Sequence, residues 1–181
     1  MVRKTKEFPF NSEAKKYLPN THYLDCFEGI LPENTEYNHE EFVACFFYKW
    51  PAWIRFLFTL RGALAKILNL EHDNSQIVSS SELPELELSE GSMLSIFSVC
   101  MKTENELIFR VDDEHLSAVL SFYLEHSNTN KLIVSTQVEF NNFKGRFYFW
   151  LIKPFHKLIV KSQLKTGLRY FKTKLTHYET V

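Results

Sequence analysis

The feature that most constrains the fold is a change of hydrophobic period near residue 140. Between Met93 and Phe140, apolar residues alternate with polar ones, the period of a half-buried β-strand. Turn-like segments interrupt this alternation at 102–105, 112–115 and 127–130, and connections this short join antiparallel neighbours. From Arg146 onward, apolar residues recur every three or four positions, as on a helix. The sequence therefore predicts an antiparallel meander followed by a long C-terminal helix.

Two shorter helices are expected before the meander, after a mixed strand in "HYLDCFEGI". Asn38 can cap the first, with Glu40 and Glu41 in its first turn. Pro51 separates it from the second, "AWIRFLFTLRGALAKILNL", which carries one apolar face. An acidic stretch over 71–92 follows, in which "SQIVSSS" is a possible further strand.

These elements predict an α+β fold in which a curved antiparallel sheet wraps around the long C-terminal helix, with two short helices after the first strand. Residues 1–20 are expected to form an N-terminal arm, and residues 21–181 a single domain. Pro154 is expected to kink the final helix or to begin a second one. The part of the final helix that packs against the core is expected to end near Ser162 to Gly167. Bases recur every four residues along this helix, and their row rotates around it until it reaches the packed side there.

Charge and cysteine content narrow the range of partners. The net charge is -1, which argues against nucleic-acid binding, although the segment between Phe140 and Tyr178 has bases and no acids. We interpret those bases as a solvated face, with peripheral contact to anionic lipid as the alternative. No apolar run is long enough for a transmembrane segment, and no secretory signal is visible. Three scattered cysteines indicate reduced thiols and a cytoplasmic protein, with neither a metal site nor a cofactor expected.

Four segments carry a resemblance to a known family. "YLDCF", "PAWIRFLFTLRGALAKILNL", "DDEHL" and "LIKPFHKLIV" occur in an order and spacing that resemble the bacterial domain of unknown function family 2867, from about Tyr23 to Leu164. The resemblance implies the helix-grip fold of the START-like (SRPBCC) superfamily. It also implies a groove or cavity between the sheet and the C-terminal helix, but no known reaction. The chain departs from the family pattern at Arg110, Ser117 and Val119, which argues against a shared catalytic activity.

The densest polar cluster is "DDEH" at 112–115. On a strand, Asp113 and His115 would share a side, and such a pair could act as a general base. Glu114 would point away, which leaves too few ligands for a metal. The interpretation we favour is a four-residue hairpin turn, in which an aspartate accepts backbone N–H groups.

Other side chains are candidates for contact with a ligand. Arg61 could bind a carboxylate, or pair with an acid of the chain such as Asp25. His156 lies beside Pro154 in the C-terminal helix. The full set of ligand-binding candidates is Trp53, Arg61, Asp113, His115, Trp150, Phe155 and His156.

Three hypotheses for function follow. The first is a binding protein for a small hydrophobic or amphipathic molecule, such as a lipid, held between sheet and helix. The second is an acid–base enzyme of the polyketide cyclase/dehydratase type, which is the less favoured of these two. The third is an interaction protein whose cavity is filled by its own Phe and Trp side chains. The sequence does not fix an oligomeric state.

Overall fold

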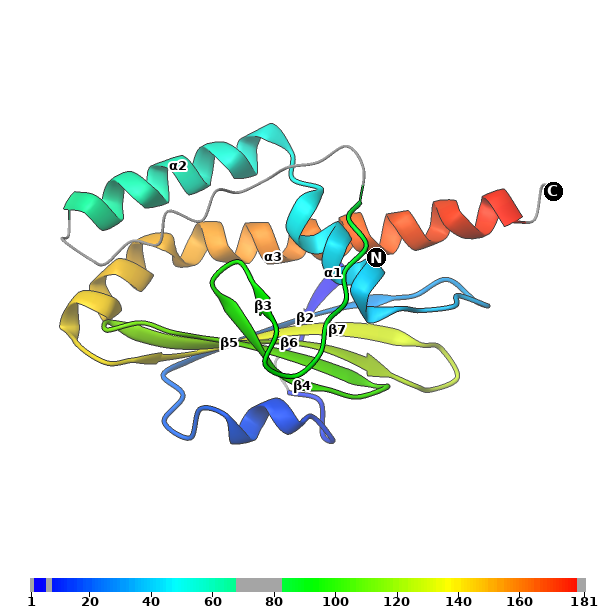
Figure 1. The fold of residues 1–181 in the computed structure, drawn as a ribbon, viewed down its shortest axis with the longest axis horizontal. Coiled ribbons are helices and arrows are strands. Elements are labelled where there is room, and N and C mark those ends of the chain that lie inside the picture. Colours follow the sequence, from blue (N-terminus) through cyan, green and yellow to red (C-terminus); the bar gives the residue numbers. More distant parts are fainter. Residues whose placement is uncertain (1, 6–7, 68–82, 179–181) are drawn as a thin grey trace.

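A computed structural model describes residues 2–5, 8–67 and 83–178, except for the side chains of 58, 61, 64–67, 177 and 178. Its centre is a seven-stranded antiparallel sheet in the order β1-β2-β7-β6-β5-β4-β3 (Figure 1). The predicted meander is confirmed, and its three hairpin turns lie where the sequence placed them. The strands are β1 Val2–Thr5, β2 Tyr23–Ile30, β3 Met93–Leu94, β4 Phe97–Lys102, β5 Glu106–Asp112, β6 Leu116–Glu125 and β7 Lys131–Phe140.

The helices also follow the predicted order. They are α1 His39–Tyr48, α2 Ala52–Ile67 and the long α3 Phe143–Tyr178, preceded by the short 3-10 helix η1 Glu13–Lys16. Asn38 caps α1 as expected, because its side chain accepts a hydrogen bond from the Glu41 N–H at 3.1 Å. The fold is therefore α+β and consistent with a helix grip.

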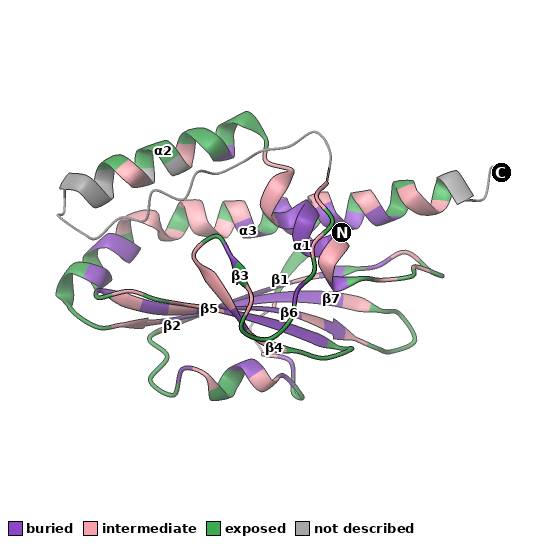
Figure 2. Cartoon of the chain, in the orientation of Figure 1, coloured by how far each residue is buried: buried purple, intermediate pink, exposed green. Residues whose placement is uncertain are grey.

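The helices α1 and α3 cover one face of the sheet, the inner face (Figure 1). The buried residues of that face meet those of the two helices in one hydrophobic core, visible as the purple layer in Figure 2. Leu168 of α3 lies over Gly29 of β2, where an added Cβ would come within 2.3 Å of the leucine side chain. Phe42 of α1 lies against Phe122 of β6. The two helices thus divide the sheet between them.

Helix α3 runs through Pro154 as one helix, so of the two alternatives for Pro154 the start of a second helix does not occur. It differs from the prediction in how far it packs, because Leu168 and Phe171, beyond Gly167, are buried in the core. The expectation that packing ends near Ser162 to Gly167 was wrong, because a second apolar row, spaced by four and three residues, lies away from the basic stripe. Gly167 itself leaves space for Phe42, whose ring an added Cβ would approach to 2.3 Å. The residues of this row are Val160, Leu164, Leu168 and Phe171.

The described part of the first 20 residues packs against the sheet. Strand β1 pairs with β2, and η1 covers the outer face, where Ala14 and Leu18 contact Ile108 and Val119. Glu106 is buried there and accepts hydrogen bonds from the hydroxyls of Ser12 and Ser121 at 2.6 Å and from the Glu13 N–H at 2.8 Å. The sequence did not predict β1, because "VRKT" is short and charged. The possible strand "SQIVSSS" lies outside the described residues.

Candidate functional site

The inner face of the sheet is built from cross-strand rows of side chains. One row joins Phe109, Leu120, Thr136 and Asp25 across β5, β6, β7 and β2. The neighbouring row toward α1 joins Leu107, Phe122, Val134 and Phe27, which are all apolar. Polar side chains therefore enter the inner face at the row of Thr136 and Asp25.

The chain's own rings occupy the interior beneath α1. Phe42, Phe46 and Phe47 project from α1, and their ring centroids lie 5.5, 5.1 and 6.5 Å from that of Phe122. Phe109 adds a further edge-to-face contact with Phe122 at 5.9 Å. Such contacts stabilise aromatic pairs in cores. This half of the interior has the filled character that the third hypothesis expects.

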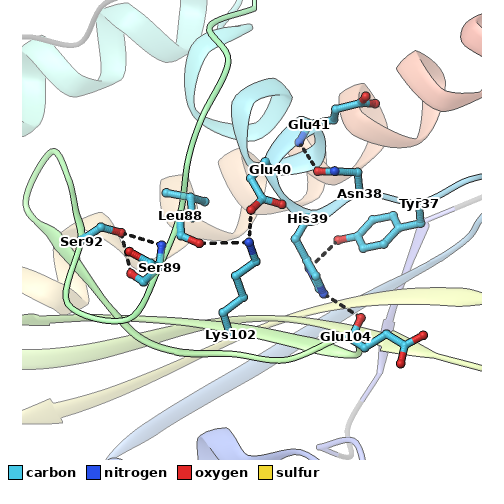
Figure 3. Close-up of polar contacts among 10 residues, drawn as sticks. All are labelled: Tyr37, Asn38, His39, Glu40, Glu41, Leu88, Ser89, Ser92, Lys102 and Glu104. Carbon is cyan, nitrogen blue, oxygen red and sulfur yellow. Dashed lines mark hydrogen bonds and ion pairs between the residues drawn. The ribbon is translucent and has the colours of Figure 1, made fainter.

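Polar groups around the start of α1 are fully paired (Figure 3). The His39 ring donates from Nε2 to the Glu104 carbonyl at 3.2 Å and accepts from the Tyr37 hydroxyl at Nδ1, 3.1 Å away. Burial lowers the pKa of His39, against a smaller opposing effect of that carbonyl, which favours the neutral tautomer this pairing requires. Lys102 contacts Glu40 and the Leu88 carbonyl. These contacts anchor α1 to the turn between β4 and β5.

A second polar cluster lies at the opposite end of the inner face. Asp25 of β2 is completely buried, and its Oδ1 lies 3.7 Å from Nε2 of His156 on α3. The Tyr23 hydroxyl donates to Asp25 Oδ2 at 2.5 Å. Thr136 is the cross-strand partner of Asp25, so both side chains stand on the same face. We call Tyr23, Asp25, Thr136 and His156 the Asp25 site.

The Asp25 site is incompletely paired. Among the described residues, Asp25 Oδ1, Thr136 Oγ1 and His156 Nε2 are buried atoms that make no hydrogen bond. The 3.7 Å separation between Asp25 and His156 exceeds a hydrogen bond but allows an ion pair. Buried polar atoms in folded proteins are nearly always paired, so a group of such exceptions requires an explanation. This geometry leaves hydrogen-bonding capacity for a ligand or for ordered water.

The electrostatics of the Asp25 site favour a charged carboxylate. Burial alone would raise the pKa of Asp25, but His156 and the Tyr23 hydroxyl outweigh it, and the net pKa lies below the usual value. Burial and the bond to Asp25 raise the pKa of Tyr23. The Lys153 ammonium lies 4.9 Å from the Tyr23 ring centroid. The site thus presents an anionic oxygen beside an imidazole, with a neutral phenol as donor.

Burial decreases on the side of the Asp25 site away from α1. The next cross-strand row joins Val111, Ala118, Val138 and Tyr23, and all of these except Val138 are only half-buried. Phe155, a predicted ligand contact, is also half-buried on α3. The Asp25 site therefore lies between a filled aromatic core and a partly exposed apolar row.

The "DDEH" cluster forms the predicted hairpin turn between β5 and β6. The Asp113 N–H donates to the Leu116 carbonyl at 2.9 Å, and the Asp113 carboxylate accepts from the Glu114 N–H at 2.6 Å. His115 Nδ1 lies 3.1 Å from Asp113 Oδ2, and its buried ring meets the edge of Tyr148. The pair joins the turn to the start of α3.

The structure separates the remaining predicted ligand contacts. Trp53 on α2 and Trp150 on α3 are 42% and 67% exposed, so both lie at the surface. The side chain of Arg61 lies outside the described residues, and Asp25, its suggested partner, contacts Tyr23 and His156. Of the predicted set, the Asp25 site includes only His156.

Sequence reasoning missed Thr136 and Tyr23 as site residues. Thr136 interrupts an otherwise apolar alternation at 132, 134, 138 and 140, and a polar residue on a predicted buried face is a signal that could have identified it. Asp25 occupies the corresponding position on β2. Tyr23 carried no comparable signal, because tyrosine is common at the ends of strands.

The described residues form neither a metal-binding cluster nor a membrane-spanning helix. No group of three or more His, Cys, Asp or Glu side chains in that part of the chain is arranged to hold a metal ion. No described helix combines the length and apolar character needed to span a membrane.

Comparison with known proteins gave one match. Neither the curated proteins nor the solved structures contain a match to this chain. Residues 17–163 match the family described as protein of unknown function (DUF2867). That range includes Tyr23, Asp25, Thr136 and His156, and it covers most of the chain. The chain therefore belongs to this family, protein of unknown function DUF2867.

Proposed function

We propose that this protein binds a small amphipathic molecule between the sheet and α3, with the polar group of the ligand at the Asp25 site. The observation that carries the proposal is that Asp25 Oδ1, Thr136 Oγ1 and His156 Nε2 are buried without a hydrogen bond among the described residues, although Asp25 and His156 face each other as an ion pair at 3.7 Å. They come from β2, β7 and α3, so they converge from both layers of the fold. A START-like relationship, as in other helix-grip proteins with an internal ligand, is part of the proposal.

The chemistry of these atoms indicates what the ligand must offer. Asp25 Oδ1 is a negatively charged hydrogen-bond acceptor, so it requires a hydrogen-bond donor such as a hydroxyl or an amine. The Thr136 hydroxyl and the His156 ring can each donate or accept. An unpaired buried polar group costs about 1–3 kcal/mol, so a ligand that pairs all three recovers a substantial free energy.

The rest of the ligand is expected to be apolar. The half-buried Val111 and Ala118 lie on the partly exposed side of the Asp25 site. On the other side, the rings around Phe122 limit how far a ligand could extend toward α1. Ligand sites of this kind are mostly apolar with a few convergent polar groups.

We also propose that the protein is bacterial and is located in the cytoplasm. Cys26, Cys45 and Cys100 are all free thiols, and Cys26 and Cys45 are buried. Burial raises the pKa of Cys26 to about 12 and that of Cys45 to about 11, so neither is a reactive thiolate. Free thiols support a reducing compartment.

The test is to recover the bound molecule. Purified protein is extracted with organic solvent, and the extract is compared by mass spectrometry with extracts of Thr136→Val and Asp25→Asn variants. We expect a compound with a hydroxyl or amine group that is retained by the wild type and reduced at least tenfold in both variants.

The matched control is Ser135→Ala. Ser135 precedes Thr136 on β7, and its hydroxyl is also buried without a hydrogen bond among the described residues, but it stands on the outer face. The control variant should retain the compound. Equal loss in Ser135→Ala, or no compound in any preparation, contradicts the proposal and favours a filled interior.

A second candidate function is acid–base catalysis by His156. The carboxylate of Asp25 lies beside the buried Nε2 of the imidazole, and the His156 side chain as a whole is 23% exposed, so a substrate would reach the ring at atoms other than Nε2. Incubating the extracted compound with the protein distinguishes the two functions. Conversion that is lost in His156→Gln indicates an enzyme, whereas unchanged compound indicates a binding protein.

A further inference from the structure

The first half of α3 presents an apolar face to solvent. Phe143, Phe147, Trp150 and Leu158 are 79%, 40%, 67% and 55% exposed, and Pro154 between them is exposed as well. The rings of Phe147 and Trp150 stack at a centroid distance of 6.0 Å. Successive steps of three or four residues keep these side chains within an arc of about 80° on the helix. This arc is called the α3 outer face.

Bases continue and flank the α3 outer face. Lys161 and Lys165 extend the same arc and are exposed, while Lys144 and Arg146 flank its beginning. The sequence from 141 to 177 contains no acid. Within the described part of the chain, α3 forms one ion pair with an acid of α1, between Lys174 and Glu41, far from this arc along the helix.

We propose that the α3 outer face docks on an anionic membrane surface. Exposed aromatic rings insert at the level of lipid headgroups, where tryptophan is favoured, and neighbouring lysines attract anionic lipid. The charge of the arc fits a negative surface, and the stacked pair supplies the apolar contact that bases alone lack.

The docking proposal is independent of the ligand site. His156 lies about 160° around the helix from the middle of the α3 outer face, so α3 can contact a bilayer while its inner side faces the Asp25 site. A membrane-bound protein would therefore hold its ligand on the side of α3 that faces away from the lipid.

The experiment is sedimentation of the full chain with two kinds of vesicle, phosphatidylcholine alone and phosphatidylcholine with about 30 mol% phosphatidylserine. We expect binding only to the anionic vesicles, weakened by added salt. The double variant Lys161→Gln/Lys165→Gln should lower the partition coefficient about 30-fold, since each base near the surface contributes about 1 kcal/mol. Phe147→Ala/Trp150→Ala should lower it at least about tenfold.

The matched control is Phe10→Ala/Lys15→Gln in the N-terminal arm. Phe10 is 93% exposed, and the Lys15 ammonium lies 5.9 Å from its ring centroid. The control therefore removes one exposed ring and one base from a surface outside the α3 outer face. It should bind like the wild type. Absence of binding, equal binding to neutral vesicles, or equal loss in the control would each overturn the proposal. A dimer that Trp150→Ala disrupts, without vesicle binding, would assign the face to a second copy of the chain.

Discussion

Replacing Gly145 with alanine sets helix propensity against packing at the junction of "DDEH" and α3. Gly145 lies in the first turn of α3, and Asn142 caps this turn by accepting its N–H at 3.0 Å. An added Cβ would lie 1.9 Å from the His115 carbonyl oxygen, whereas real Cβ contacts essentially never fall below 3.0 Å. Because the contact is with backbone, no side-chain rotation relieves it.

The magnitude follows from three contributions. Overpacking costs about 1–3 kcal/mol, and separating the two segments weakens the hydrogen bond from the Asn141 N–H to the His115 carbonyl, worth about 1 kcal/mol. Alanine returns about 1 kcal/mol of helix propensity. The net expectation is that Gly145→Ala lowers the free energy of unfolding by about 1–3 kcal/mol.

Urea denaturation followed by circular dichroism measures this difference, with Lys144→Ala as the control at an exposed neighbour in the same turn. The control should change the free energy of unfolding by less than about 0.5 kcal/mol. If Gly145→Ala is as stable as the wild type or more so, the close approach of α3 to the hairpin is refuted.

Two further predictions concern buried polar groups. The folded-state pKa of Asp25 lies below its unfolded value, so its stabilising contribution is present above about pH 4 and is lost as the pH falls through the folded pKa. The difference in unfolding free energy between wild type and Asp25→Asn, measured by denaturant titration, should therefore be larger at about pH 6 than at about pH 3. A difference that does not change with pH would contradict this prediction. Gln163 Nε2 donates to the carbonyls of Phe46 at 2.7 Å and Lys49 at 3.2 Å, and Gln163→Leu should lower the unfolding free energy by about 1–3 kcal/mol because both carbonyls lose this donor. An unchanged urea midpoint for Gln163→Leu would show that these bonds do not hold the end of α1 to α3.

Local patterns were sufficient to predict most of the fold. Period-two alternation with short turns determined β4 to β7, because each strand pairs with its neighbour in sequence. Asn38 and Pro51 marked the helices before the meander. The full extent of packing on α3 was not predictable from charge spacing, because it depends on which side of the helix meets Phe42 and Phe27.

The Asp25 site was only partly predictable. His156 was identified as a polar residue near Pro154, but its partner Asp25 is 131 positions away in sequence, and no local pattern relates the two. Their pairing depends on β2 lying beside β7 beneath α3, which is a property of the sheet order. Thr136 was overlooked because threonine is favourable in strands, so its polar character on the inner face was not weighed.

The contacts of Glu106 have a consequence for how the chain assembles. The segment around Ser12 and Ala14 precedes the meander in the sequence, yet it packs on an outer face that is made by strands extending as far as Phe140. Its bonds to Glu106 and Gln137 span 94 and 123 positions. Such long loops close slowly, so this segment must wait while the meander forms. A segment that precedes the meander in the sequence would then be among the last to pack.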